Sequence, residues 1–415
     1  MIKFFITILC VQQLSVSTPA VQPNRLISYV LPDKRSFKKA LGYIEDTYLN
    51  FTELTNKYGY PNEQHTIITE DEYLLTVFRV LSKCKQVQQY PVILMHGLID
   101  TSDTWILTGP KSGLAYILSN NCYDVWAPNL RGNTYSRKHK HLNPNRDPDY
   151  WEFSFDENGF YDLPAIIDYV INMTRQTKVY YVGHSQGTTG FFIMGSLRPE
   201  YNKKIQLAVN LAPVTFLKNV RNPIAKITAA ATRIIKMILD DAGFAEIFGK
   251  HEFFHVITEF LCQLDPNDVC GVGLSLTTGY SPYTITSRNL AVAFGHVLAG
   301  LSVKTLSHFG QLVMTGKFQR YDEDREGNIE RYGKPRPPKY NVSLVTSPVV
   351  LICAKSDWIS TLEDAKILSS KLPNLVEEYI VPDPRWSHNN YVWGNNVTDN
   401  VYNKILDYFK IFNIL

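Results

Sequence analysis

The sequence has no strong excess of charge of either sign and no long basic tract. Its 415 residues include 42 Lys and Arg and 39 Asp and Glu, so the formal net charge at pH 7 is only +3. No dense run of Lys and Arg with interleaved aromatic residues occurs. Because nucleic-acid binding depends on such basic surfaces, we expect no nucleic-acid partner.

Long apolar runs, zinc-binding patterns and repeats are also missing. No segment reaches the roughly 18 consecutive apolar residues that a membrane-spanning helix needs. The nearest, residues 290–301, is interrupted by Gly295 and His296. The six cysteines show no zinc-site spacing with histidine, and we find no internal repeat or low-complexity tract. These absences predict a soluble chain without a transmembrane segment. The length of 415 residues predicts one large domain with an insertion.

The first residues are typical of a secretory signal peptide. Lys3 supplies the positive start, and residues 4–11 form a short apolar stretch. Ser17 is a small residue suited to cleavage, and Ala20 is a second option. We therefore predict a signal peptide over residues 1–17 and a secreted protein, with the lysosome as the alternative destination. A short buried helix is the alternative interpretation of the apolar stretch.

Glycosylation sequons and cysteines agree with export. Four Asn-X-Ser/Thr sequons begin at Asn50, Asn172, Asn341 and Asn396. If Cys10 leaves with the signal peptide, five cysteines remain. Cys262 and Cys270 flank the turn-rich sequence QLDPNDV, and we predict a disulfide between them. The odd count leaves at least one other thiol free or bonded elsewhere. Cys353 lies in an apolar run and is expected to be a small buried residue.

Short apolar runs separated by turns and helical patterns predict the central fold. Residues 65–68 and 73–80 are expected to form an antiparallel hairpin. Six further apolar runs cover residues 91–95, 123–127, 179–182, 205–211, 349–353 and 379–381. Continuous apolar strands that alternate with helices are typical of a parallel sheet covered on both faces. We therefore predict an α/β fold with a mostly parallel central sheet.

Helical patterns replace the strands between residues 214 and 340. Isoleucines recur at helical spacing over residues 224–238. This stripe is interpreted either as the insertion's own core or as a face that contacts a membrane. We predict a helical cap with a lid over residues 214–340, inserted between two core segments, residues 18–213 and 341–415.

The sequence Gly-His-Ser-Gln-Gly, residues 183–187, stands between an apolar strand and a helical run. This is the strand, sharp turn and helix of a nucleophile elbow, in which the glycines allow a tight turn and close packing. A G-x-S-x-G pattern alone is weak, and an inert glycine-rich turn is the alternative. The flanking strand and helix make the pattern specific, and we predict Ser185 as a nucleophile.

A nucleophilic serine needs a base, and the base needs an orienting carboxylate. In this fold they follow the serine in the order acid, then histidine. His388 is the last of ten histidines and follows the last predicted strand, so we predict it as the base. Asp357 comes soon after residues 349–353, where ligand-facing loops of a parallel sheet lie. We predict Asp357 as the acid, with Asp383 as its rival. An exposed loop histidine and a helix-capping aspartate are the alternatives.

Acyl transfer also needs backbone N–H groups that stabilise an oxyanion. One donor is expected from Gln186, directly after the nucleophile, and the other from Leu98, in the loop after residues 91–95. His96 and His184 are expected to pack nearby and not to act as bases.

A set of motifs extends this pattern over most of the chain. They are YGYPNEQH (58–65), TEDEY (69–73), HGL (96–98), SDTW (102–105), RGNTYSRKH (131–139), FSFDE (153–157), YDLPA (161–165), GHSQGTT (183–189), DW (357–358) and His388. With these motifs the chain resembles the acid lipase family, which includes gastric and lysosomal acid lipases and insect midgut lipases. The resemblance runs from about residue 55 to residue 405.

The resemblance implies an α/β-hydrolase with a Ser185–Asp357–His388 triad and an oxyanion hole from Leu98 and Gln186. It also implies a cap, with the Cys262–Cys270 disulfide, over an apolar acyl pocket. Family substrates are triacylglycerols, cholesteryl esters and related esters, hydrolysed without a metal or organic cofactor.

Four positions depart from the family pattern. His388-Asn389-Asn390 stands where His-Leu-Asp is usual, and this change is expected to alter the orientation of the loop or its pH response. Glu72 stands where glycine is usual, and Phe309 follows His308 where tryptophan is frequent.

Together these features predict a secreted or lysosomal lipase that meets its lipid ester at an oil–water interface, as a monomer. The alternatives are a short-chain carboxylesterase and a non-catalytic lipid-binding protein on a hydrolase scaffold. The apolar insertion favours long acyl chains, since burial of each CH₂ contributes about 0.8 kcal/mol.

Overall fold

The computed structural model describes residues 34–249 and 252–414 and divides the chain into two compact units. The first unit ends at Tyr43, and its described part holds the short helix α3 (Lys34–Ala40). The second unit, Ile44–Leu415, holds the sheet and all other helices described below. The predicted signal peptide over residues 1–17 lies outside the described residues.

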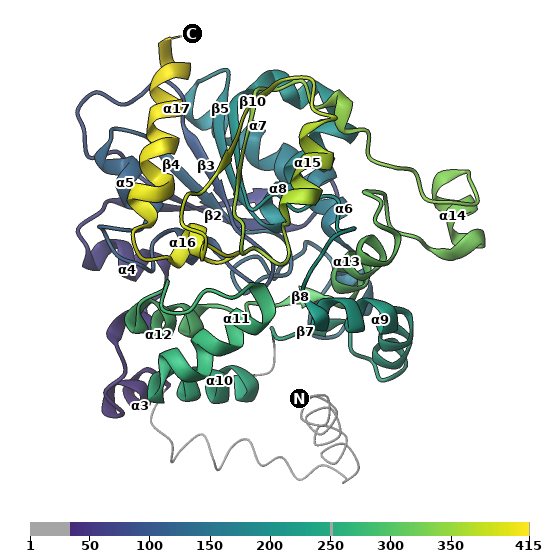
Figure 1. Ribbon diagram of the computed structural model, residues 1–415, viewed down its shortest axis with the longest axis horizontal. Helices are drawn as coiled ribbons and strands as arrows, with labels where there is room; N and C mark the ends of the chain where they lie inside the picture. Colours follow the sequence, from purple (N-terminus) through teal and green to yellow (C-terminus); the bar gives the residue numbers. More distant parts are fainter. Residues whose placement is uncertain (1–33, 250–251, 415) are drawn as a thin grey trace. The chain divides into compact units, whose positions relative to one another are not determined.

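The second unit is built on an eight-stranded sheet with the order β1-β2-β4-β3-β5-β6-β9-β10 (Figure 1). The strands are β1 (Asn62–Ile68), β2 (Leu74–Val80), β3 (Val92–Met95), β4 (Val125–Pro128), β5 (Val179–His184), β6 (Ile205–Leu211), β9 (Val349–Cys353) and β10 (Leu375–Ile380). β2 pairs antiparallel with β1 and β4, and the remaining neighbours are parallel. The predicted hairpin and mostly parallel sheet are confirmed.

The hairpin turn between β1 and β2 shows why glycine is expected there. Glu72 has a φ of 70°, in the left-handed region that residues other than glycine rarely adopt. The Thr69 N–H donates to the Tyr73 carbonyl and closes the turn. Glu72 therefore occupies a conformation that suits glycine better.

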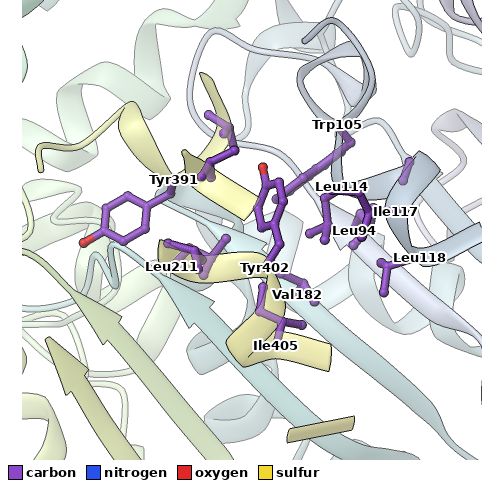
Figure 2. Close-up of a cluster of buried hydrophobic side chains, with 14 of the residues drawn as sticks. Leu94, Trp105, Leu114, Ile117, Leu118, Val182, Leu211, Tyr391, Tyr402 and Ile405 are labelled. Carbon is purple, nitrogen blue, oxygen red and sulfur yellow. The ribbon is translucent and has the colours of Figure 1, made fainter. Parts of the chain in front are cut away.

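Helices cover both faces of the sheet, and successive strand residues alternate between the two cores. In β5, Tyr180 and Val182 pack into one core, while Val179 and Tyr181 pack into the other. Helices α4 (Phe51–Lys57), α5 (Leu114–Asn120), α16 (Asn390–Trp393) and α17 (Asn403–Ile414) contribute to the first core, and α6 (Phe155–Glu157), α7 (Leu163–Thr174), α8 (Gln186–Leu197) and α15 (Leu362–Ser369) to the second. Figure 2 shows the first core, where Leu94, Val182 and Leu211 of three strands meet side chains of α5 and α17.

Short 3₁₀ and π-helical turns complete the unit. They are η1 (Glu45–Thr47), η2 (Ser102–Trp105), η3 (Pro148–Trp151), η4 (Asn158–Asp162), η5 (Pro199–Lys204), η6 (Pro266–Gly271), η7 (Val342–Leu344) and η8 (Thr398–Tyr402).

The segment between β6 and β9 is helical, and Figure 1 shows α9 to α12 together at one end of the sheet. It contains α9 (Pro223–Asp241), α10 (Glu252–Leu264), α11 (Val272–Thr278), α12 (Ser287–His296), α13 (Val303–Thr315), α14 (Asp324–Tyr332) and the two-stranded sheet of β7 (Glu246–Ile247) and β8 (Leu301–Ser302). Ile227, Ile234 and Ile238 of α9 are each more than half exposed. Ile224 and Ile235 of the same stripe are half-buried, so the stripe is partly packed and partly exposed.

Two disulfides are present in the second unit. Cys262 and Cys270 are bonded, as predicted, at the end of α10 and in η6. The second disulfide joins Cys84, in the loop after β2, to Cys122, after α5, and was not predicted. Cys353 is a buried free thiol in β9, as expected.

Two further features concern the glycosylation sequons and the character of the helices. The four sequon asparagines, Asn50, Asn172, Asn341 and Asn396, are all exposed. Over residues 34–249 and 252–414, none of the helices has both the length and the apolar character needed to cross a bilayer.

Candidate active site

Ser185 lies at a sharp turn between β5 and α8, with φ of 52° and ψ of −116°. The glycines on both sides are needed for packing. A Cβ on Gly187 would lie 2.6 Å from the Met95 carbonyl oxygen, and one on Gly183 would lie 2.9 Å from the Gly187 carbonyl carbon. The local structure is therefore that of the nucleophile elbow, with the serine in a strained conformation.

Ser185, His388 and Asp357 come together from three distant parts of the chain. The distance from His388 Nε2 to Ser185 Oγ is 2.8 Å, and that from His388 Nδ1 to Asp357 Oδ2 is also 2.8 Å. In the tautomer that fits both contacts, the serine hydroxyl donates to Nε2 and Nδ1–H donates to the carboxylate. All three side chains are at least nine-tenths buried, so bulk water competes little for these bonds.

The Asp357 carboxylate is held on both oxygens. Oδ1 accepts backbone N–H bonds from Ile359 and Ser360, while Oδ2 faces His388. Asp383, the rival in the sequence, instead bonds the backbone and guanidinium of Arg385. The structure thus brings Asp357 and not Asp383 to the histidine.

Two backbone segments border the serine where an oxyanion would form. A Cβ on Gly97 would lie 3.3 Å from Ser185 Cβ, so the Gly97–Leu98 loop passes directly beside the nucleophile. Gln186 is the first residue of α8, and first-turn N–H groups lack partners inside a helix. Leu98 and Gln186 also line one small cavity, whose lining includes Arg131 but not Ser185. The loop and the helix start both lie next to the serine, which is where the predicted oxyanion donors are needed.

His96 and His184 are buried supports of this site. The Nε2–H of His184 donates to the His388 carbonyl at 2.8 Å, and His96 contacts the Gly97 carbonyl through Nδ1 at 2.8 Å. Burial lowers the pKa of His184 to about 3 and that of His96 to about 4. Both rings therefore stay neutral in mild acid and add no charge beside the reacting groups.

A buried polar network, which could not be predicted from the sequence, holds the side chain of Gln186. Gln186 Nε2 donates to Asn158, whose Nδ2 donates to Asp162. Arg131 lies beyond, with Nε on Asp162 and Nη2 on Asp71, each at 2.8 Å. These residues belong to separate motifs, RGNTYSRKH and YDLPA among them, and no local spacing couples them. The network ties the residue after the nucleophile to the β1–β2 hairpin.

The fold is that of known α/β-hydrolases. Family profiles described as "Partial alpha/beta-hydrolase lipase region" and "alpha/beta hydrolase fold" match residues 51–109 and 90–231. A carboxylesterase of Bacillus subtilis superposes with a TM-score of 0.50, at 12% identity over 88% of this chain and 99% of that chain. An epoxide hydrolase of Bacillus megaterium gives a TM-score of 0.50, at 14% identity over 83% and 100%. The protein is an α/β-hydrolase by fold.

Sequence relatives define the family more narrowly. Lipase 3 of Drosophila melanogaster is 37% identical over 84% of this chain and 89% of its own length. Human gastric triacylglycerol lipase is 36% identical, over 86% and 90%. The lysosomal acid lipase/cholesteryl ester hydrolase of Macaca fascicularis is 34% identical, over 93% and 96%. The chain belongs to the acid lipase family and is an ester-hydrolysing enzyme.

Proposed function

We propose that the enzyme is a lipase that hydrolyses the ester bonds of neutral lipids, with Ser185 as its nucleophile. Triacylglycerols are the proposed main substrates, and cholesteryl esters are a second class. The observation that carries the proposal is the unbroken chain of hydrogen bonds from Ser185 through His388 to Asp357. The names of the relatives support the lipid ester as substrate.

The reaction proceeds through an acyl-enzyme. Ser185 Oγ attacks the ester carbonyl as His388 Nε2 takes its proton, and Asp357 stabilises the resulting imidazolium. The backbone N–H groups of Leu98 and Gln186 stabilise the oxyanion. His388 then protonates the leaving alcohol. A water molecule, deprotonated by the same histidine, hydrolyses the acyl-enzyme and releases the fatty acid.

The substrate is proposed to enter from the apolar segment between β6 and β9. Residues 214–340 act as the cap, and the exposed isoleucines of α9 contact the lipid surface. The two disulfides and the exposed sequons support export, for which we assign residues 1–17 as signal peptide and the outside of the cell as destination.

The proposal is tested by fatty-acid release from an emulsion of a long-chain triacylglycerol and from a soluble short-chain ester. Ser185→Ala is expected to lower turnover on both substrates by about 10⁶-fold. Release from the emulsion that depends on Ser185 establishes a lipase. Release from the soluble ester alone makes the enzyme a short-chain carboxylesterase, and the absence of release from either contradicts the proposal and favours a lipid-binding role.

A further inference from the structure

Asn390, two residues after His388, is fully buried at the start of α16. Its Oδ1 accepts a bond from the Ser387 backbone N–H at 3.0 Å and lies 2.9 Å from the Ser387 hydroxyl. Its Nδ2 donates to the Thr284 carbonyl at 3.3 Å. The amide therefore connects the residue before His388 to a segment that lies between β6 and β9 in the chain.

The orientation of this amide is fixed by its partners. A backbone N–H only donates, so the side-chain oxygen must face Ser387. A backbone carbonyl only accepts, so the nitrogen must face Thr284. The Ser387 hydroxyl lies 2.9 Å from both Asn390 Oδ1 and Ser281 Oγ and is the donor toward these two oxygens. An ionised carboxylate at position 390 could accept from Ser387 but could not donate to Thr284.

Residues 278–284 contact the Asp357 loop as well. The Trp358 N–H donates to the Thr278 carbonyl at 3.1 Å, and Ser356 Oγ donates to the Tyr280 carbonyl at 2.7 Å. Gly279 lies between them with a φ of 127°, and a Cβ there would lie 1.8 Å from the Ser356 carbonyl oxygen. The segment is therefore bonded closely to both loops that carry the acid and the base.

We infer that Asn390 is a positioning residue that fixes the His388 loop to residues 278–284. This inference rests on the proposed role of His388 as the base. His184 holds the His388 carbonyl, and Asn390 holds Ser387 on the other side. The imidazole is thus carried between two anchored points, one in the elbow and one in the segment before α12.

The anchor is also neutral. Titratable groups near His388 include Asp357, which bonds it, and His184, whose pKa burial lowers to about 3. Tyr391, which packs on His184, stays neutral because burial raises its pKa well above the ordinary value. An amide at position 390 adds no charge that changes with pH, so the hold on the loop does not depend on pH. A carboxyl group at position 390 would make the attachment of the His388 loop depend on pH.

The test substitutes Asn390→Asp and follows kcat and KM against pH on the soluble ester. Burial and the Thr284 carbonyl favour the protonated form of the new carboxyl, and the two Ser387 donors favour the carboxylate; full burial is expected to prevail and to raise the pKa. At acid pH the protonated group donates to Thr284, and kcat stays near that of the wild type. As pH rises through the raised pKa, kcat should fall about tenfold or more, with KM changed little, because the base is misplaced.

Asn389→Asp is the matched control, since it introduces the same charge one residue closer to His388. Asn389 is only half-buried, and within the described residues its side chain makes no hydrogen bond. Its pH profile should follow the wild type within about threefold, because the amide anchor is intact. Asn390→Ala should lower kcat at every pH, since it removes the anchor and adds no titrating group.

Folding is checked by melting each variant at the same pH values. If Asn390→Asp unfolds, Ser281→Ala, which removes one hydroxyl at the far end of the bridge, should still slow labelling of Ser185 by a fluorophosphonate several-fold. Profiles of Asn390→Asp and Asn389→Asp that coincide overturn the inference, as does unchanged labelling of Ser281→Ala. Wild-type activity that survives Ser185→Ala overturns the proposed function instead, and the inference with it.

Discussion

The central sheet and the segment between β6 and β9 differ in how many of their apolar residues are exposed. Every residue of β5, β6 and β9 is buried. In α9, a helix of 19 residues, only Ala229 is buried. Of the 25 large hydrophobic side chains that are exposed in the described residues, sixteen lie between residues 214 and 340. The apolar residues of these three strands are all buried in the fold, whereas the segment buries some, such as Val292 and Leu312, and exposes many others.

The sheet and the segment between β6 and β9 therefore have different roles. The sheet holds Ser185 in its strained turn and brings Asp357 and His388 to it. The segment contacts this site through polar groups of residues 278–284, and it exposes many apolar side chains elsewhere on its surface. Changes in the sheet region should therefore affect chemistry and stability, and changes on the apolar surface should affect access to lipid.

The largest effect is expected at Asp357, the proposed acid of the triad. Asp357→Asn leaves the shape of the site intact but removes the charge that orients His388, so kcat should fall about 10⁴-fold. The measurement is hydrolysis of a soluble ester. Asp383→Asn, in the same part of the chain, is the control and should retain wild-type activity. A large loss in Asp383→Asn with a small one in Asp357→Asn would reverse the assignment of the acid.

The second largest effect is a loss in the free energy of unfolding, which should differ between a buried and an exposed arginine. Arg131 is fully buried between Asp162 and Asp71, and its removal leaves Asp162 as an unpaired buried carboxyl. Arg131→Met should lower the free energy of unfolding by about 3–5 kcal/mol. Arg233 of α9 is 85% exposed in its ion pair with Asp324, and Arg233→Met should change it by about 1 kcal/mol or less. Urea unfolding measures both, and equal losses would contradict the comparison.

The third effect concerns the lipid surface. Ile234→Asp with Ile238→Asp removes two exposed isoleucines of α9, and activity on the emulsion should fall about tenfold. Activity on a soluble ester should stay unchanged. Ile411→Asp, an equally exposed isoleucine of α17, is the control and should affect neither substrate. Equal loss on emulsion and soluble ester would contradict the docking role of α9.

The smallest effect lies where α12 meets η1 and η2. His296 Nδ1 is 2.8 Å from Asp103 Oδ2, and its Nε2 is 2.6 Å from the Asp46 carbonyl. Burial by itself would lower the pKa of His296, but the hydrogen bond and charge of Asp103 raise it above the ordinary value. The imidazolium therefore contributes stability that is fully present below the ordinary pKa of histidine. This contribution is lost as pH rises through the raised pKa.

His296→Gln should consequently destabilise the protein more at pH 5 than at pH 9, by about 1 kcal/mol. Thermal melting of wild type and variant at both pH values measures the difference. A difference that does not depend on pH would show that the histidine acts only by packing.

The sequence was a good guide where one physical cause dominates a pattern. Strands buried on both faces are continuously apolar, so β3, β5, β6 and β9 could be located within a residue or two. β10 was predicted only at residues 379–381 because Glu377 and Glu378 interrupt its apolar pattern. The strand in fact starts at Leu375. It tolerates the two glutamates because it lies at the edge of the sheet and is only partly buried. The elbow was located because its turn requires glycines on both sides of the serine.

The rest depends on contacts between distant residues. The Cys84–Cys122 disulfide spans 38 residues, and neither cysteine lies in a pattern that marks the other. The links from Gln186 to Arg131 and from Asn390 to Thr284 need the folded chain. Periodicity located α9 but could not tell whether its apolar stripe faces protein or surroundings, because both environments select the same residues.

The elbow has a consequence for how such a chain evolves. Ser185 adopts a backbone conformation that glycine tolerates better, and a residue of this kind costs of the order of 1–3 kcal/mol. Selection for thermal robustness alone would replace this serine with glycine. With Ser185 as the proposed nucleophile, this strain is kept for turnover, and Ser185→Gly should give a more heat-resistant but inactive protein.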